Sequence, residues 1–175
     1  NDKKAVKFGI EISAESACIA KRKGIEVFNC DILDAPAVRK YELIFAVDIW
    51  EHVLDPYSFI AKLKDLLSQG GVAYITFPLA NSLIYKSGIF LGKFGFMKKS
   101  VERLFPPFHT FYLSFGSARK IIRDAGLEII CLKGKRLNWK ELAIKNHFAK
   151  NTVYFFNMIE SWLGLPSLGE AIVKL

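Results

Sequence analysis

The sequence predicts an α/β fold built on a doubly wound, mostly parallel sheet. Two observations lead to this prediction. Short apolar runs rich in β-branched residues alternate along the chain with stretches of helical amphipathic period. Glycine or proline punctuates the boundaries between them. Strands that alternate with helices are typical of parallel sheets, because each parallel return needs a crossover connection.

The composition is that of one folded domain without a membrane span. The 175 residues are 51% hydrophobic and 24% charged, which is enough to bury a core. No uninterrupted apolar run reaches roughly 18 residues, and the opening NDKK is not a secretory signal, so we expect a cytoplasmic protein.

The three cysteines lack the short spacing of zinc or redox sites. A formal charge of +8 suits anionic partners but does not indicate a chemistry.

The first part of the chain predicts two strands around one helix. Lys7–Ile12 is short, apolar and β-branched, which is typical of a strand. Ser13 is a suitable cap for a helix that runs to about Lys23 and ends at Gly24. Glu26–Ile32 is the next predicted strand, and an Asp-Ala-Pro loop follows it.

The middle of the chain repeats this alternation. Tyr41–Asp48 is almost continuously apolar, as expected for a strand covered on both faces. Pro56 opens an amphipathic helix, which the pair Gly70-Gly71 is predicted to end. Val72–Phe77 is then predicted to form another buried strand, stopped by a proline.

The last part of the chain adds two helices and two strands. Ser114–Ala125 predicts a helix and Leu127–Leu132 a strand. Asn151–Leu163 predicts an aromatic amphipathic helix, and Ala171–Leu175 a final strand.

We expect a single domain over residues 1–175, with two special regions. Over residues 79–108 the periodicity blurs, so we predict a lid or insertion there. A C-terminal helix and strand lie within residues 137–175.

Acidic residues stand at the ends of three predicted strands. These are Glu11, Asp31 and Asp48. In doubly wound sheets ligands bind beyond the carboxyl ends of the strands. A carboxylate there can accept hydrogen bonds from ribose hydroxyls or from an adenine amine. The alternative is that each acid caps a helix or lies in a solvated loop.

Five stretches, taken in order, resemble those of a known family. They are GIEIS (9–13), CDIL (30–33), YELIFAVDIWEHVLDP (41–56), LLSQGGVAYITFP (66–78) and FHTFYLSFGSARKIIRDAGLEII (108–130). The set resembles class I S-adenosylmethionine-dependent methyltransferases, in their small-molecule (ubiquinone-biosynthesis-like) branch. The resemblance implies a Rossmann-like fold, S-adenosylmethionine as cofactor, and methyl transfer to an oxygen, nitrogen or carbon atom of a small molecule.

The resemblance also implies a set of cofactor-binding residues. Glu11 would accept from the ribose hydroxyls, Asp31 would face the adenine amine, and the backbone near Asp48 would lie beside the methionine moiety. The full set is Glu11, Ile12, Asp31, Ile32, Val47 and Asp48.

The family's first strand and Gly-rich loop have no counterpart in the sequence. In the family's sheet that strand lies between the strands predicted at Lys7–Ile12 and Tyr41–Asp48. Without it, two rows of backbone groups in the sheet lack partners. One alternative function is therefore a catalytically silent partner subunit. A second is a nicotinamide-binding oxidoreductase, because those enzymes also bind ribose with a strand-end acid.

Two histidines are the candidate catalytic residues. His109 follows the predicted lid, and its pKa range suits a general base; a structural role is the alternative. His52 belongs to Asp48-x-x-Glu51-His52, which resembles the magnesium site of certain O-methyltransferases and which His109 could complete. We expect Asp48, Glu51 and His52 to converge but to hold no metal.

The expected partner is a small-molecule acceptor, held between residues 79–108 and the C-terminal aromatic helix. We do not expect a nucleic-acid partner. Lysines alternate with large apolar residues over Lys86–Lys99, a pattern typical of segments on anionic membrane surfaces, so peripheral membrane contact stays open.

Overall fold

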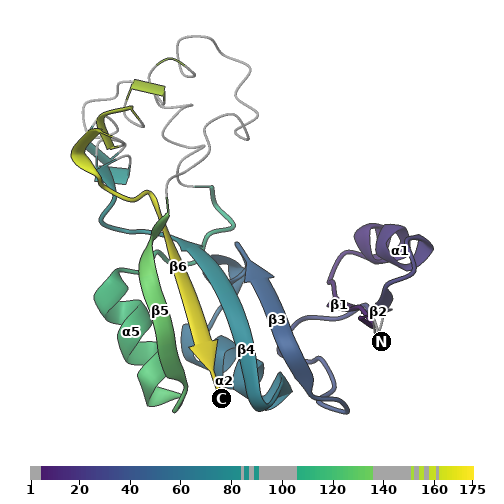
Figure 1. Cartoon of the computed structure of the whole chain (residues 1–175). Helices are drawn as coiled ribbons and strands as arrows, with labels where there is room; N and C mark the ends of the chain where they lie inside the picture. Colours follow the sequence, from purple (N-terminus) through teal and green to yellow (C-terminus); the bar gives the residue numbers. More distant parts are fainter. Residues whose placement is uncertain are drawn as a thin grey trace.

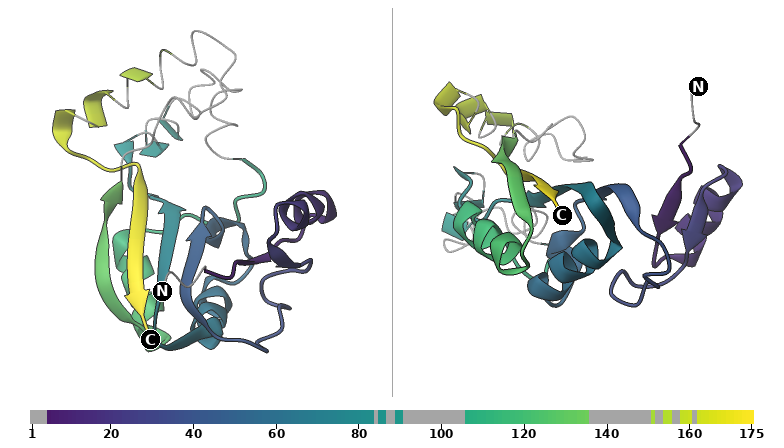
Figure 2. Two further views of the ribbon diagram at one scale, coloured as in Figure 1. Left: turned by 45° about the vertical axis from the view of Figure 1, so that its right-hand side comes forward. Right: turned by 60° about the horizontal axis from the view of Figure 1, so that its bottom comes forward.

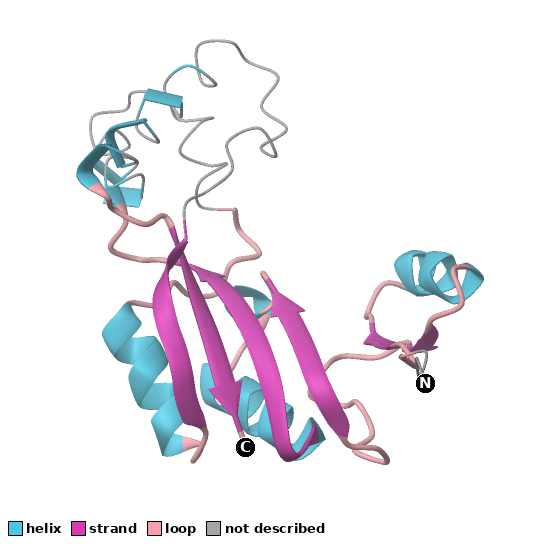
Figure 3. Ribbon diagram, viewed as in Figure 1, coloured by secondary structure: helices cyan, strands magenta, loops and turns pink. Residues whose placement is uncertain are grey.

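The computed structural model of the chain describes residues 5–83, 85–86, 89–90, 106–135, 151, 154–155, 158–160 and 162–175. Helices and strands alternate through most of these residues, which confirms the α/β class (Figures 1 and 3). The elements are β1 (Phe8–Ile10), α1 (Ala14–Arg22), β2 (Glu26–Phe28), β3 (Tyr41–Val47), the 3-10 helix η1 (Trp50–His52), α2 (Pro56–Leu66), β4 (Leu67–Pro78), α5 (Phe115–Asp124), β5 (Glu128–Lys135) and β6 (Leu168–Lys174). None of the described helices is long and apolar enough to cross a membrane.

The strands form two separate sheets. β1 and β2 pair in parallel, and a four-stranded sheet has the order β3-β4-β6-β5. Figure 1 shows the β1–β2 unit beside the β3 edge of the larger sheet. In that sheet β3 and β4 are parallel, whereas β6 is antiparallel to both β4 and β5. The predicted parallel arrangement therefore applies to β1–β2 and β3–β4 but not to the pairs that β6 makes.

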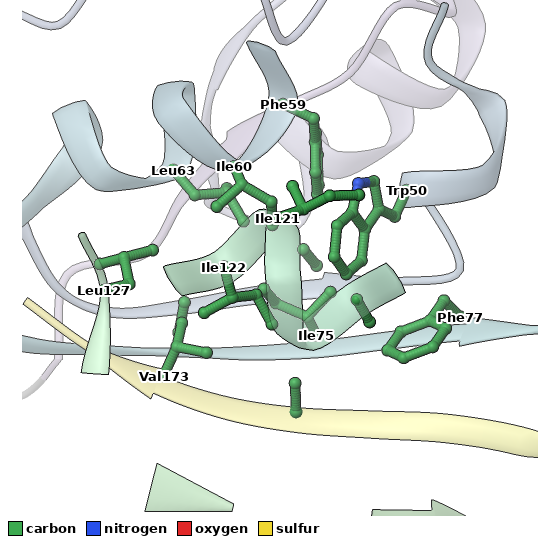
Figure 4. Packing of buried hydrophobic residues seen from close by; sticks show 14 of the residues in the cluster. Trp50, Phe59, Ile60, Leu63, Ile75, Phe77, Ile121, Ile122, Leu127 and Val173 are labelled. Atoms are coloured by element: carbon green, nitrogen blue, oxygen red, sulfur yellow. The ribbon is translucent and has the colours of Figure 1, made fainter. Parts of the chain in front are cut away.

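The hydrophobic core lies between the four-stranded sheet and two helices on one of its faces. Figure 2 shows α2 and α5 side by side on that face. The side chains that meet there are drawn in Figure 4 and include Trp50, Phe59, Ile60, Leu63, Ile75, Phe77, Ile121, Ile122, Leu127 and Val173. Each is at least nine-tenths buried. This packing fixes the loop after β3, because Trp50 belongs to both the loop and the core.

The opposite face of the sheet is exposed at β3. Successive side chains of a strand point to opposite faces. Ala46 accordingly faces the core, whereas Leu43, Phe45 and Val47 are exposed, with Phe45 at 68%. Among the described residues no helix covers this face. The described helices therefore cover one face of this sheet, and the doubly wound arrangement that the sequence predicts stays a prediction.

Helix starts match the sequence prediction because they depend on local capping. The Ser13 hydroxyl accepts a hydrogen bond from the Ser16 N–H at the start of α1. The Ser114 hydroxyl does the same for Ser117 N–H at the start of α5. β2 is shorter than predicted and ends at Phe28, since the Asn29 side chain then donates to backbone carbonyls beyond β1.

The end of α2 differs from the prediction. The helix ends at Leu66, and Gly70-Gly71 lie inside β4 instead of closing the helix. Pairing with β3 jumps across these residues, which form a bulge. Gly70 has φ +74°, and a Cβ on Gly71 would lie 2.8 Å from the Tyr41 carbonyl oxygen. Both positions therefore need glycine, Gly70 for its left-handed backbone and Gly71 for its close approach to β3. The end of a helix is not the reason.

Candidate functional site

The three predicted strand-end acids lie on both sides of the space between the two sheets. Glu11 follows β1, and its backbone N–H donates to the Phe28 carbonyl at the end of β2. Asp31 lies three residues beyond β2, and Asp48 directly follows β3. The strands of each parallel pair end at the same edge, so these acids flank the carboxyl ends of β1, β2 and β3.

Two of these acids also make the local bonds of the alternative interpretation. Glu11 Oε1 accepts from the Ser13 N–H at 2.8 Å, and Asp31 Oδ1 accepts from the Leu33 N–H at 2.8 Å. Each bond uses one carboxylate oxygen. In the described part of the chain no protein donor reaches the second oxygen of either group. A role in the local turn therefore leaves one acceptor oxygen for a ligand.

The apolar residues of the predicted cofactor set have different surroundings. Ile12 is 70% exposed and Val47 50% exposed, beside the ends of β1 and β3. Ile32 is partly buried and packs against the main hydrophobic core. Two of the three are thus open to a ligand, while Ile32 also connects the loop after β2 to the larger sheet.

Asp48 is held in an unusual backbone conformation. Its φ of 52° lies in the left-handed region, which is costly for a residue with a Cβ and is often found at functional sites. The buried Thr76 hydroxyl on β4 accepts from the Asp48 N–H at 3.0 Å and donates to Asp48 Oδ1 at 2.8 Å. β4 therefore sets the direction of the chain where it leaves β3. No local sequence pattern marks Thr76.

Glu51 is a buried carboxyl group in the loop after β3. It is 3% exposed, and its Oε2 has no hydrogen-bond partner. Burial is the main cause that raises the pKa of Glu51 to about 7, and the negative charge of Asp48 raises it further. The hydrogen bond at its own backbone and the nearby His52 act in the opposite direction. The group therefore gains a proton close to neutral pH.

His52 and His109 lie against each other. Their ring centroids are 4.7 Å apart, with an interplanar angle of 72°. His52 Nδ1 lies 3.2 Å from the Phe108 carbonyl oxygen, and His109 Nδ1 lies 3.1 Å from the Tyr112 hydroxyl. Burial, and then the nearby His52 imidazole, lower the pKa of His109, while Asp48 acts in the opposite direction. His109 is therefore neutral at physiological pH.

Thr110 brings these histidines together. Its N–H and hydroxyl donate to the Glu51 carbonyl at 2.9 and 3.0 Å, and the hydroxyl also lies 2.6 Å from the Val53 carbonyl. The segment that carries His109 is thereby held against η1. Sequence reasoning missed Thr110, because its two partners lie more than fifty residues away and no local pattern marks the contact.

Two tyrosines complete the surroundings of His109. The Tyr85 and Tyr112 rings have centroids 4.9 Å apart, and the Tyr112 ring also contacts His109. Burial raises the pKa of Tyr112 to about 12 and also raises the pKa of Tyr85. Both hydroxyls are therefore protonated at neutral pH.

The predicted convergence of Asp48, Glu51 and His52 takes a different form. Asp48 is bonded to Thr76, and His109 joins Glu51 and His52 instead. One ligand atom from each of these three side chains lies within 4.8 Å of the others. His147 and most of the predicted lid fall outside the described residues.

Sequence comparisons find no matching family model and no matching curated protein. Solved structures do match. A methyltransferase from Mesorhizobium loti superposes with a TM-score of 0.64 at 11% identity, covering 98% of this chain and 81% of that one. A possible histamine N-methyltransferase from Thermotoga maritima gives 0.62 at 15% identity, covering 96% and 72%. The plantazolicin methyltransferase BamL, solved with SAH, gives 0.61 at 14% identity, covering 98% and 68%.

This chain has the fold of S-adenosylmethionine-dependent methyltransferases. The expectation from the five sequence stretches is confirmed at that level. Identities of 15% or less show the fold and not the activity.

Proposed function

We propose that this protein binds S-adenosylmethionine and transfers its methyl group to an oxygen, nitrogen or carbon atom of a small molecule. The observation that carries the proposal is the placement of Glu11, Asp31 and Asp48 at the strand ends of a methyltransferase fold. BamL and the mycolic acid cyclopropane synthase CmaA1 were both solved with SAH, which supports this choice of cofactor. Neither alternative function has a comparable observation in its favour.

The described residues fit this cofactor. The second oxygen of Glu11 is available for the ribose hydroxyls, and that of Asp31 for the adenine amine. The exposed Ile12 and Val47 side chains offer apolar contact to the cofactor beside these acids. Ile32 is partly buried and packs against the core. Asp48, in its left-handed conformation, turns the backbone where the methionine moiety would lie.

The facing edges of β1 and β3 support a proposal about the strand that the sequence resemblance implies. Neither facing edge has a strand partner among the described residues. A cavity of about 930 Å³ lies at the amino ends of β1 and β3, lined by Val6, Phe8, Tyr41 and Glu42, and the Phe8 and Tyr41 ring centroids there are 5.5 Å apart. We propose that a further strand pairs with β1 and β3 there, because that pairing would satisfy two rows of backbone groups.

His109 is the proposed proton acceptor, and His52 holds its ring in place. In the tautomer in which His109 Nδ1–H donates to the Tyr112 hydroxyl, Nε2 takes a proton from the acceptor atom as that atom becomes a nucleophile. The lowered pKa of His109 keeps this nitrogen unprotonated. Bound S-adenosylmethionine would supply an electrophilic methyl group on a sulfonium. Much of the remaining rate enhancement would come from the positioning of the two reactants.

Calorimetric titration with S-adenosylhomocysteine tests the cofactor assignment. The wild-type protein should bind it, and Glu11→Ala should bind roughly tenfold to a hundredfold more weakly, because a charged acceptor for the ribose is lost. Glu15→Ala is the matched control, since Glu15 is an exposed acid in the first turn of the adjacent α1. Binding of NAD without binding of S-adenosylhomocysteine would contradict the proposal.

A further inference from the structure

One carboxylate and two imidazoles converge at the loop after β3. Donor atoms of Glu51, His52 and His109 all lie within 4.8 Å of one another. A four-coordinate zinc ion with its ligands at the usual distances needs donor separations of ~3.4 Å. The widest pair would have to close by roughly 1.4 Å, measured against that ideal. The His52 side chain is 38% exposed, so its ring has room to make this adjustment.

The buried carboxyl group lacks a partner that a cation would supply. Glu51 Oε2 is fully inaccessible and accepts no hydrogen bond, while Oε1 lies 4.0 Å from His52 Nε2. Buried polar groups are nearly always paired, and a native exception calls for an explanation such as an ion. This observation concerns the same carboxyl group as the donor cluster and is independent of the spacing of the three donors.

Both imidazoles are oriented as metal ligands usually are. A carbonyl oxygen only accepts hydrogen bonds, so the contact with Phe108 places the proton of a neutral His52 on Nδ1 and leaves the lone pair on Nε2. In the tautomer in which His109 Nδ1–H donates to the Tyr112 hydroxyl, the lone pair of His109 is also on Nε2. Histidine ligands characteristically bond their second nitrogen in this way, because the bond fixes the tautomer and the ring orientation.

We infer that Glu51, His52 and His109 form a binding site for a divalent transition-metal ion of the zinc class. Two imidazoles and one carboxylate suit zinc, whereas magnesium prefers a set of oxygen ligands. The Asp48 carboxylate that the sequence pattern would add is bonded to Thr76. Three protein ligands also leave a fourth position open. This inference replaces the expectation that the site holds no metal.

The metal site does not depend on the proposed methyl transfer, but the two share one atom. A bound ion would occupy His109 Nε2, which is the proposed proton acceptor. Metal binding and proton acceptance are therefore alternatives for His109. A binding measurement without any methyl acceptor tests the metal site alone.

The test titrates zinc into chelator-treated protein against a chromogenic chelator. We expect one zinc ion per chain, and we expect millimolar magnesium not to displace it. Glu51→Gln and His52→Asn should each weaken zinc binding at least roughly tenfold, since even loss of a supporting outer-shell group costs that much. Cobalt in place of zinc should give the visible absorption of a low-coordinate site, and both variants should lose it.

Three controls keep the outcome interpretable. His147→Asn changes the remaining histidine of the chain, and Cys18→Ser removes an exposed thiol; neither should alter zinc binding. Thermal unfolding without metal shows whether each variant is folded. Added zinc should raise the melting temperature of the wild type and not of His52→Asn. Absence of stoichiometric binding, equal affinity in Glu51→Gln and His52→Asn, or magnesium binding as tight as zinc binding would overturn the inference.

Discussion

At the scale of single residues, the candidate site depends on contacts between side chains far apart in the sequence. His52 and His109 adjoin because Thr110 donates to the carbonyls of Glu51 and Val53. The sequence predicted the chemistry of both histidines from residue type and neighbouring motif. Their contact, and the burial of Glu51, follow from the docking of the His109 segment onto η1. No local pattern reports that docking.

Replacing His109 by alanine should slow methyl transfer and leave cofactor affinity nearly unchanged. Loss of a general base typically lowers the rate by about a hundredfold to ten-thousandfold, while ground-state binding of the cofactor is not touched. The measurement is turnover of methyl-labelled S-adenosylmethionine in metal-free protein with an acceptor found by screening. S-adenosylhomocysteine affinity is measured in parallel.

His147→Ala is the control for the loss of one imidazole, and it should retain wild-type turnover. If His109→Ala also turned over at the wild-type rate, His109 would be structural. Positioning of the two reactants would then be the main source of rate enhancement.

At the scale of elements, Glu170 joins three strands of the larger sheet. The Tyr74 hydroxyl on β4 donates to Glu170 Oε2 at 2.9 Å, and Lys133 on β5 lies 3.2 Å from Oε1. Partial burial raises the pKa of Glu170, but the hydrogen bonds from Tyr74 and Lys133 outweigh it and lower the pKa below 4.5. The charged carboxylate is therefore the form that holds β6 between its neighbours.

The contribution of Glu170 to stability should disappear in acid. A carboxyl group whose pKa is lowered by folding adds stability above its unfolded pKa, near 4.5, and loses it as pH falls through the folded value. The free energy of unfolding of the wild type should exceed that of Glu170→Gln at pH 7. This difference should shrink as the pH drops below 4.5. Urea unfolding at a series of pH values measures it.

Glu128→Gln on β5 controls for the loss of one surface carboxylate, because Glu128 is exposed and makes no ion pair in the described structure. A difference between wild type and Glu170→Gln that stayed constant down to strongly acidic pH would show that the Tyr74 and Lys133 contacts do not depend on the carboxylate charge.

At the scale of the whole molecule, β3 is an edge strand of the larger sheet with one exposed apolar face. Its outer edge has no strand partner among the described residues, and Leu43, Phe45 and Val47 are exposed on one face. An open strand with exposed apolar side chains is a template for pairing with another chain. Where the further strand proposed above does not cover this edge, we expect a second copy to associate through β3.

Phe45→Lys should reduce this self-association, because it places a charge where another chain would pack. Sedimentation velocity over a range of protein concentrations measures the effect, and thermal unfolding should show little loss of stability, since Phe45 is 68% exposed. Leu54→Lys, at an 88% exposed residue in the loop before α2, is the matched control. Equal association of Phe45→Lys and wild type would locate the contact elsewhere.

The sequence alone determined the order of most elements and the starts of the helices. Apolar periodicity, the Ser13 and Ser114 caps and the strand-end acids are local features, so neighbouring residues suffice to predict them. The prediction extended the strand at Glu26–Ile32 too far and placed the end of α2 at Gly70-Gly71, whereas the helix ends at Leu66. Each error arose where a contact between distant segments replaced the local preference, as Asn29 does at the end of β1 and Gly71 does beside Tyr41.

Only the tertiary structure decided the features that carry function. β6 pairs antiparallel between β4 and β5, so the last strand of the chain is internal to the sheet. Thr76 orients Asp48, and Thr110 brings His109 to Glu51. These contacts join residues separated by at least 28 positions. Their energies depend on which segments meet in the folded chain, and the local sequence at either end does not encode that.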